Sequence, residues 1–342
     1  MIISRTPYRI SFFGGGTDYP AWYRQHGGRV LATTINKYCY ISCRYLPPFF
    51  EHRYRVVYSK TEEVADIRSI AHPAARTILQ HMKFTHGLEI HHDGDLPARS
   101  GIGSSSAFVV GMIHALSALR GRMVSKDFLS REAMYVEQEC LKEIVGCQDQ
   151  IISAHGGLNV IMFETSGETS VRRLIITPER AKELNDHLML FFTGIKRTAS
   201  QVAKSYANNV GENHQHLRLI SETVDEGIRI LTNGDLQDFG KLLHEAWQVK
   251  RRLGAHVSNP QVDEIYARAL RAGALGGKLI GAGGGGFMLL FVPPALRTTV
   301  RQALSDLLYV PFNFESEGSQ IVFYDPEEDY LTLEHYNAAS VH

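Results

Sequence analysis

A short segment of small residues carries the clearest chemical potential in this sequence: Gly101, Ile102 and Gly103, then Ser104, Ser105 and Ser106. The glycines follow an expected strand and turn, and an almost wholly apolar helix is predicted to begin at the serines. The first amide N–H groups of a helix have no partner inside it, and the helix dipole adds positive potential there. The hydroxyls can hydrogen-bond phosphate or ligate Mg²⁺. We therefore predict a phosphate-binding loop, with an ordinary serine N-cap after a glycine turn as the alternative.

A second glycine cluster, Gly14-Gly15-Gly16, stands between Arg9 and Asp18. A guanidinium can neutralise phosphate charge, and a carboxylate can hydrogen-bond a polyol. Arg9 and Asp18 are therefore candidate ligand-binding residues. A solvent-exposed arginine and an aspartate that caps the next turn are the alternatives.

A third cluster, Gly281–Gly286, has the glycine spacing of the dinucleotide-binding fingerprint. That fingerprint requires a helix directly after the glycines, whereas the apolar run 287–292 is short and ends at Pro293-Pro294. The segment therefore predicts a strand, a glycine turn and a second strand. The bare backbone of the turn can let a ligand approach closely or can form a plain hairpin.

Acidic residues gather in a predicted helix over 126–145 and just after it. Most of the glutamates along this helix are expected to face solvent. The four glutamates of this helix are Glu132, Glu137, Glu139 and Glu143. Asp149 follows between two glutamines, and its position fits a helix N-cap and a buried catalytic carboxylate equally well.

The elements that position these residues fall into two halves. In the first half, helices are predicted over 74–82, 104–119 and 126–145, and strands over 29–35, 38–44, 54–59, 87–92 and 157–163. In the second half, helices are predicted over 199–208, 214–232, 236–253, 262–272 and 295–306, and strands over 188–192, 278–281, 286–292 and 320–324. Clustered strands followed by clustered helices indicate an α+β fold. We place the two domains at residues 1–182 and 183–342.

The composition excludes several classes of function. The 36 basic residues balance the 36 acidic ones, so no net field attracts nucleic acid or an anionic membrane. The longest apolar run is too short to span a bilayer, and the N-terminus lacks a signal-peptide pattern. The four cysteines lack zinc-site spacing and are expected to be reduced, buried thiols. We expect a cytoplasmic monomer or homodimer that binds neither nucleic acid nor membrane.

The three glycine clusters together resemble the GHMP kinases. The family pattern has an N-terminal Pro-x-Arg segment that leads to a glycine and an aspartate, a central Pro-x-x-x-Gly-x-Gly-Ser-Ser loop, and a C-terminal glycine-rich turn between strands. Pro7, Pro97 and the clusters match it in order and approximate spacing over nearly the whole chain. The resemblance implies an ATP- and Mg²⁺-dependent kinase with a small-molecule substrate. It also implies two α+β domains, the first like ribosomal protein S5 domain 2 and the second ferredoxin-like.

The resemblance also implies roles for individual residues. Asp149 would be the catalytic carboxylate, and Arg9 would stabilise the transferred phosphoryl group. The ATP phosphates would lie against Gly101, Gly103, Ser104, Ser105 and Ser106. Mg²⁺ would be held by Ser105 or Ser106 together with Glu139. The substrate side would include Asp18, Gly15, Gly16, Gly283, Gly284 and Gly285. Arg197 is a candidate partner for a second phosphate, with a solvated helix start as the alternative.

Within the family, the triple glycine is similar to the anomeric sugar kinases that act on D-glycero-D-manno-heptose 7-phosphate, with fucokinase-type enzymes next. Galactokinases have Glu-His where this chain has Gly15-Gly16. The change removes two polar sugar contacts, which suits a larger, phosphorylated sugar. The expected product is the 1,7-bisphosphate, made for nucleotide-activated heptose synthesis. The alternatives are a fucose, galactose or isoprenoid-precursor kinase and a catalytically silent binding protein on the same fold.

Overall fold

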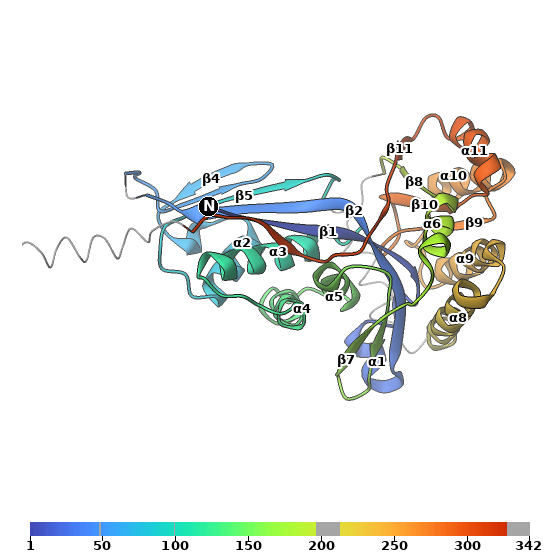
Figure 1. The fold of residues 1–342 in the computed structure, drawn as a ribbon, viewed down its shortest axis with the longest axis horizontal. Helices are drawn as coiled ribbons and strands as arrows, with labels where there is room; N and C mark the ends of the chain where they lie inside the picture. Colours follow the sequence, from blue (N-terminus) through green and yellow to red (C-terminus); the bar gives the residue numbers. More distant parts are fainter. Residues whose placement is uncertain (48, 99, 196–212, 327–342) are drawn as a thin grey trace, which may run out of the picture.

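The strands form two sheets in the computed structural model, which describes residues 1–47, 49–98, 100–195 and 213–326 (Figure 1). The first sheet contains β1 (Ile2–Phe13), β2 (Gly28–Tyr45), β3 (Tyr54–Val57), β4 (Thr61–Val64), β5 (Leu88–Gly94), β6 (Asn159–Phe163), β7 (Thr169–Arg173), β12 (Phe314–Glu315) and β13 (Gln320–Tyr324). The second sheet contains β8 (Leu188–Phe192), β9 (Gly276–Leu279), β10 (Phe287–Phe291) and β11 (Leu308–Val310).

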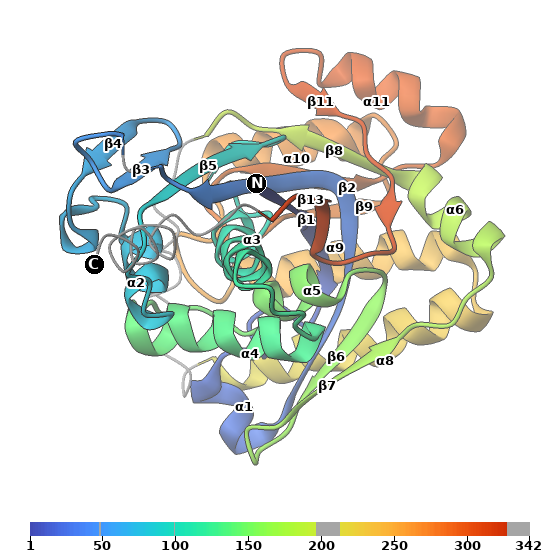
Figure 2. The same cartoon turned by 60° about the vertical axis from the view of Figure 1, so that its left-hand side comes forward.

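The long antiparallel pair of β1 and β2 organises the first sheet. Its main strand order is β13-β1-β2-β5-β3-β4, and β6 and β12 also pair with β2. The register places Arg9 opposite Thr34, well inside the pair. Figure 2 shows both strands passing through the middle of the molecule beside α3 (Ser104–Leu119). The strand β1 therefore carries Arg9 to a central position.

Helix α3 is buried from Ser106 to Leu119, apart from the half-buried His114. It packs against β1 and β2 on one side and against α2 (Pro73–His81), α4 (Lys126–Tyr135) and α5 (Gln148–His155) on the other. Apolar residues lie on nearly every side of this helix, so it has no solvent face to present. Its N-terminus is consequently held in place at the Gly101–Gly103 loop.

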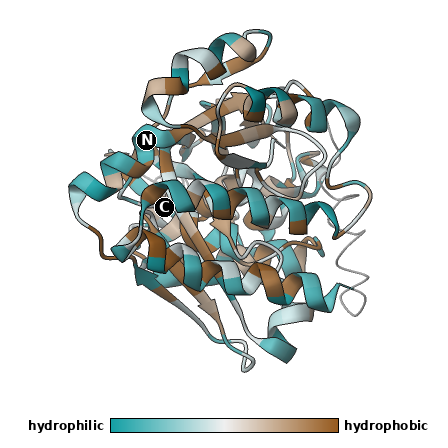
Figure 3. Cartoon of the chain, turned by 90° about the vertical axis from the view of Figure 1, so that its right-hand side faces the viewer, coloured by the Kyte–Doolittle hydropathy of each residue, from teal (hydrophilic) through white to brown (hydrophobic). Residues whose placement is uncertain are grey.

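The second sheet is covered by helices from the second half of the chain. The remaining helices are α1 (Pro20–His26), α6 (Pro178–His187), α8 (His214–Asn233), α9 (Leu236–Arg251), α10 (Pro260–Arg271) and α11 (Arg297–Ala303). The 3₁₀ turns span Ile67–Ser69 and Pro294–Leu296, and a π-helical turn spans Val136–Cys140. Buried residues recur every three or four positions along α8, as expected for a helix with one buried face. Figure 3 shows hydrophilic and hydrophobic residues alternating along the helices that face the viewer.

Several sequence predictions are confirmed and others are corrected. The α+β class is confirmed, and α3, β8 and β13 have their predicted bounds. The strand β1 was not predicted, and the predicted strands 29–35 and 38–44 form the single strand β2. The predicted helix over 126–145 ends at Tyr135 as an α-helix and then passes into the π-helical turn. The predicted helix over 199–208 lies outside the described residues.

The sheet topology also departs from the predicted domain boundary. β13 pairs with β1, placing Tyr324 opposite Ile2, and β12 pairs with β2. The free edge of β1 is thereby covered. The last described strands therefore belong to the first sheet, although residues 183–342 were predicted as one separate domain. In the part of the chain described here, no helix combines the length and apolar character needed to cross a membrane.

Candidate active site

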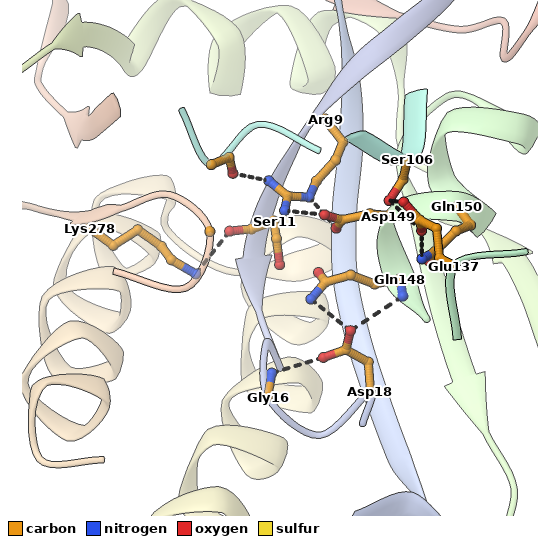
Figure 4. Close-up of polar contacts among 12 residues, drawn as sticks. Arg9, Ser11, Gly16, Asp18, Ser106, Glu137, Gln148, Asp149, Gln150 and Lys278 are labelled. Atoms are coloured by element: carbon orange, nitrogen blue, oxygen red, sulfur yellow. Dashed lines mark hydrogen bonds and ion pairs between the residues drawn. The ribbon is translucent and has the colours of Figure 1, made fainter. Parts of the chain in front are cut away.

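Arg9 and Asp149 form the polar centre of the site (Figure 4). Arg9 comes from β1, and Asp149 comes from the first turn of α5, whose N-cap is Cys147. The guanidinium donates from Nε to Oδ1 at 2.6 Å and from Nη2 to Oδ2 at 2.7 Å. Such a bidentate pair fixes orientation as well as charge. The Arg9 side chain is 4% exposed and that of Asp149 is 24% exposed, so Arg9 holds in place a carboxylate that solvent still reaches.

The predicted phosphate loop lies directly against this ion pair. Arg9 Nη1 donates to the Gly101 carbonyl at 2.6 Å. Gly103 has a φ of +75°, and a Cβ there would lie 3.2 Å from Arg9 Cγ and 3.4 Å from Asp149 Oδ2. A side chain at this position would be strained and would press on both partners. The glycine thus lets the loop approach the ion pair.

The N-terminus of α3 opens at the same place. No side chain in the described part of the chain caps it, and its N-cap is Gly103. Ser105 is exposed, whereas Ser106 is buried. Because an uncapped helix N-terminus attracts anions, the loop can place a phosphate beside Asp149. Arg99, at the start of this segment, lies outside the described residues.

A buried carboxylate lies beneath the serines, but it is Glu137 and not the predicted Glu139. Ser106 Oγ donates to Glu137 Oε2 at 2.9 Å, and Gln150 Nε2 donates to the same oxygen. Glu139 is exposed and forms an ion pair with Lys142 at 3.2 Å. Of the predicted metal ligands, Ser105 or Ser106 together with Glu139, the structure brings Ser106 to Glu137 and leaves Glu139 on the surface. Glu137 lies at the start of the π-helical turn Val136–Cys140.

Burial raises the pKa of Glu137 to about 8, against the hydrogen bonds from Gln150 and Ser106, which lower it. No basic side chain among the described residues hydrogen-bonds this carboxyl group. A buried carboxylate beside a hydroxyl, without a cation partner, suits a bound cation. The donors also suit Mg²⁺, which takes oxygen ligands and is commonly held by one or two protein groups plus substrate phosphates. No cluster of three or more His, Cys, Asp or Glu side chains that could hold a metal occurs in the described chain. Any Mg²⁺ at Ser106 and Glu137 would therefore need phosphate ligands.

Asp18 was predicted to contact the sugar, but in the structure its carboxylate is buried and accepts hydrogen bonds from the protein itself. It is 1% exposed, and its Oδ1 accepts the Gly16 N–H at 2.9 Å. Its Oδ2 accepts from Gln148 N at 3.3 Å and from Gln148 Nε2 at 3.0 Å. A Cβ on Gly146 would lie 1.8 Å from Asp18 Oδ2. Asp18 therefore ties the triple-glycine turn to the start of α5.

Burial raises the pKa of Asp18, and the charge of Asp149 acts in the same direction, whereas the hydrogen bonds from Gly16 and Gln148 oppose the rise. The buried group is satisfied by protein donors. Gly15 and Gly16 are half-buried and therefore more accessible than Asp18, and their predicted substrate contact stays a prediction.

The third glycine cluster packs against the phosphate loop. Gly286 has a φ of +98°, and a Cβ there would lie 2.0 Å from the Ser100 carbonyl oxygen. Gly284 N donates to the Val257 carbonyl at 2.9 Å, and a Cβ on Gly283 would lie 2.6 Å from that same oxygen. A Cβ on Gly285 would lie 2.5 Å from the Ile195 carbonyl oxygen. Close packing thus explains these glycines, and the predicted substrate contact stays a prediction.

Several site residues escaped the sequence predictions, and Arg197 lies outside the described residues. Lys278, on β9, is buried and donates to the Ser11 carbonyl at 2.9 Å and to the Phe12 carbonyl at 2.8 Å. Burial lowers the pKa of Lys278 well below its usual value, and the charges of Lys250 and Arg9 add to this effect. Ser11 and Gln148 also reach the site (Figure 4). Residue type alone gave no reason to select a lysine or a serine on a strand.

Two family models match this chain. The model of the GHMP kinases N terminal domain matches residues 69–157, and the model of the GHMP kinases C terminal domain matches residues 228–310. The two ranges together span half of the chain.

Relatives of similar length cover nearly the whole chain. It is 28% identical to D-glycero-alpha-D-manno-heptose 7-phosphate kinase of Campylobacter jejuni, over 93% of this chain and 97% of that one. It is 25% identical to the galactokinase of Pyrococcus furiosus, over 92% of this chain and 96% of that one. It spans 36% of the longer L-fucokinase/L-fucose-1-P guanylyltransferase of Bacteroides fragilis, at 26% identity over 90% of this chain.

Solved structures share the fold. A D-glycero-D-manno-heptose 1-phosphate kinase from Bacteroides thetaiotaomicron superposes with a TM-score of 0.78 at 23% identity, over 94% of this chain and 99% of that one. A Lactococcus lactis galactokinase complexed with galactose superposes with a TM-score of 0.72 at 16% identity, over 93% of this chain and 94% of that one. With both halves of the chain matched and the same fold throughout, this protein belongs to the GHMP kinase family and is a kinase.

Proposed function

We propose that this protein transfers the γ-phosphoryl group of ATP to the anomeric hydroxyl of a sugar. The acceptor we propose is D-glycero-D-manno-heptose 7-phosphate, which would give the 1,7-bisphosphate for nucleotide-activated heptose synthesis. The observation that carries the proposal is the bidentate Arg9–Asp149 pair set against Gly103 at the uncapped N-terminus of α3. A carboxylate, a fixed cation and an anion-binding helix end then meet at one point, as phosphoryl transfer requires.

The ATP phosphates would lie over Gly101 and Gly103 and along the exposed edge of the serines. The amide N–H groups of the first turn would donate to phosphate oxygens, and the Ser105 hydroxyl would add a donor. A guanidinium has more N–H groups than the three contacts that Arg9 makes to Asp149 and Gly101 use. Arg9 can therefore still donate to the transferred group without releasing Asp149.

Mg²⁺ fits beside Ser106 and Glu137. When bound there with ATP, the ion would neutralise phosphate charge. Glu137 must give up its proton to act as a ligand, and Ser106 then keeps its hydroxyl oxygen available beside it. Ser106 takes precedence over Ser105 in this assignment because it is the serine that contacts Glu137.

Asp149 would accept or orient the proton of the acceptor hydroxyl. Both of its oxygens already accept from Arg9, which fixes the direction of the carboxylate. An anomeric hydroxyl is more acidic than a simple alcohol, so an ordinary carboxylate suffices as the base. Arg9 contacts both the Gly101 carbonyl and Asp149. It would therefore connect the loop that binds ATP to the carboxylate that meets the sugar hydroxyl.

The choice of acceptor rests on similarity together with the sequence of the first glycine cluster. The heptose 7-phosphate kinase of Campylobacter jejuni matches almost end to end, whereas the fucokinase relative is a longer, two-function chain. Gly15 and Gly16 leave room where a galactokinase has Glu-His. A fucokinase- or galactokinase-type specificity is the second candidate, favoured by the matches to those enzymes. We place the reaction in the cytoplasm, where ATP is available and the described cysteines would stay free thiols.

An acceptor panel with ATP and Mg²⁺ tests the proposal. ADP release is measured with heptose 7-phosphate, L-fucose, D-galactose and D-mannose. We expect the highest kcat/KM with heptose 7-phosphate, and a higher value with an unphosphorylated hexose would reject this acceptor. Asp149→Asn keeps the shape and removes the base, and we expect kcat to fall by about 10²-fold or more. Asp225→Asn, an exposed carboxylate paired with Arg29, serves as the matched control. An unchanged kcat in Asp149→Asn would refute the assigned role.

A further inference from the structure

Among the buried polar atoms that have no hydrogen-bond partner in the described part of the chain, two belong to side chains beside Gly15 at the active site. They are Ser11 Oγ and Gln148 Oε1. Ser11 is 4% exposed and Gln148 is 9% exposed. Leaving a buried polar group unpaired costs free energy, so such atoms in a folded protein call for an explanation. One such explanation is a ligand that forms hydrogen bonds with these atoms when it binds.

Both side chains border the same space, which lies over Gly15. A Cβ built on Gly15 would be 3.6 Å from Ser11 Oγ and 3.7 Å from Gln148 Nε2, both ordinary contact distances, with no other described atom within 4 Å beyond the neighbouring residues. Gly15 is not in the left-handed region of φ, so its lack of a side chain is not required by the backbone. The structure therefore has room for one further heavy atom beside Gly15, in contact with Ser11 and Gln148, at a glycine that the turn does not need.

The chemistry of the two groups defines what can fill this space. Gln148 Nε2 donates to the Asp18 carboxylate, which leaves Oε1 as an acceptor only. Figure 4 shows this oxygen on the side of Ser11 and Asp149, away from Asp18. The Ser11 hydroxyl can donate or accept. An amide oxygen repels a phosphate or carboxylate, whereas a neutral hydroxyl can donate to it and accept from Ser11.

We propose that a neutral hydroxyl of the sugar acceptor occupies the space over Gly15, and that Ser11 and Gln148 select it. The inference rests on the proposed sugar-kinase function and adds two specificity-determining residues to it. The adjacent Asp149 would meet the reacting hydroxyl, while Ser11 and Gln148 bind a second hydroxyl of the same ring. The phosphate of a sugar phosphate must then lie outside this space.

Ser11→Ala tests the inference against a matched control on the same strand. Ser4 is also fully buried on β1, but its Oγ donates to the Gly111 carbonyl at 2.8 Å. Ser4→Ala breaks a satisfied bond, so it should lower the melting temperature and leave the KM for acceptor unchanged. Ser11→Ala removes an unpaired hydroxyl, so it should keep or raise the melting temperature. It should raise the acceptor KM about 3- to 10-fold and leave the KM for ATP unchanged.

Gly15→Ala is the second variant. Its Cβ fits the empty protein without a clash, so folding and ATP binding should persist while the acceptor KM rises by about tenfold or more. The third measurement is the binding of acceptor analogues that each lack one hydroxyl. In the wild type, removal of one particular hydroxyl should weaken binding, and in Ser11→Ala removal of that same hydroxyl should cost much less, because the two changes break one interaction.

The measurements are made with whichever sugar of the panel the wild type phosphorylates best, and sugar binding is also measured by calorimetry. If that sugar is not heptose 7-phosphate, the proposed acceptor fails while the inference over Gly15 is still tested. If Ser11→Ala and Gly15→Ala both keep the wild-type acceptor KM, the inference is overturned and the kinase assignment stands. If none of the sugars binds or reacts, both proposals fall.

Discussion

Glu137 offers the sharpest test of the electrostatics of this site. Its carboxyl group is fully buried, and its described partners are Ser106 and Gln150. In Glu137→Gln an amide of the same shape replaces a group that can ionise. Gln150 Oε1 has no partner in the described structure and can accept the new N–H after an amide rotation. The substitution therefore changes charge far more than packing.

The expected size of the effect follows from the pKa. Burial raises the pKa of Glu137 from 4.5 to about 8. Between these pH values the folded protein holds a proton that the unfolded chain has lost, so the free energy of unfolding falls as pH rises. The two pKa values differ by about 3.5, and each pKa unit corresponds to about 1.4 kcal/mol. The loss of unfolding free energy therefore has an upper limit of about 5 kcal/mol. The loss begins near pH 4.5 and is complete above pH 8.

Urea unfolding in EDTA without nucleotide, at several pH values from about 5 to about 8.5, measures the effect. Near pH 5 the wild type and Glu137→Gln should have similar free energies of unfolding, and above pH 8 the variant should be the more stable. Glu139→Gln, an exposed site two residues further on, should follow the wild type at every pH. Parallel curves for the wild type and Glu137→Gln would show that Glu137 does not titrate as a buried group, and the reasoning would be wrong.

Three further predictions concern the metal, the glycine turn and the buried lysine. Ser106→Ala should raise the Mg²⁺ concentration needed for half-maximal activity by about tenfold or more, whereas Ser105→Ala should leave it near the wild-type value; Mg²⁺ titration of ADP release decides. Gly286→Ala should destabilise the protein and weaken ATP binding because its Cβ meets the Ser100 carbonyl, whereas Gly121→Ala, strained in φ but in open space, should lower only the melting temperature. Lys278 has a lowered pKa, so the unfolded chain binds its proton more readily, and the stability of the wild type relative to Lys278→Met should rise with pH toward about 10. A difference in unfolding free energy between the two proteins that stays level over that range would count against the assignment.

The serine loop and its helix could be predicted because their causes are local. Two glycines in the left-handed region and an uninterrupted apolar helix specify the same structure without help from the rest of the chain. Asp149 was selected only through the family pattern, since the residues around it fit a helix cap as well. In the structure Cys147 is the N-cap, and Asp149 is the second residue of the helix and pairs with Arg9, so Asp149 does not cap this helix.

The error at Glu139 has a different origin. Leu129 and Ala133 are buried, and Glu137 follows them at the same four-residue interval, so the periodicity of the helix already placed Glu137 on the buried face. That pattern was available in the sequence, but a glutamate on an apolar stripe is easily taken for a surface residue. The π-helical turn from Val136, whose carbonyl accepts from Leu141 N, could not be foreseen from a regular period.

Asp18 shows how a long-range contact can change the meaning of a residue. By type and position it suggested a sugar ligand, yet Gln148, 130 residues away, meets its carboxylate. The bond fixes the triple-glycine turn to the helix that carries Asp149. Under the proposal made above, acceptor recognition would fall to Ser11 Oγ and Gln148 Oε1, which have no partner in the described structure. Both are neutral, so selectivity would depend on the pattern of hydroxyls around the ring, and a charged substituent would have to be recognised by another part of the protein.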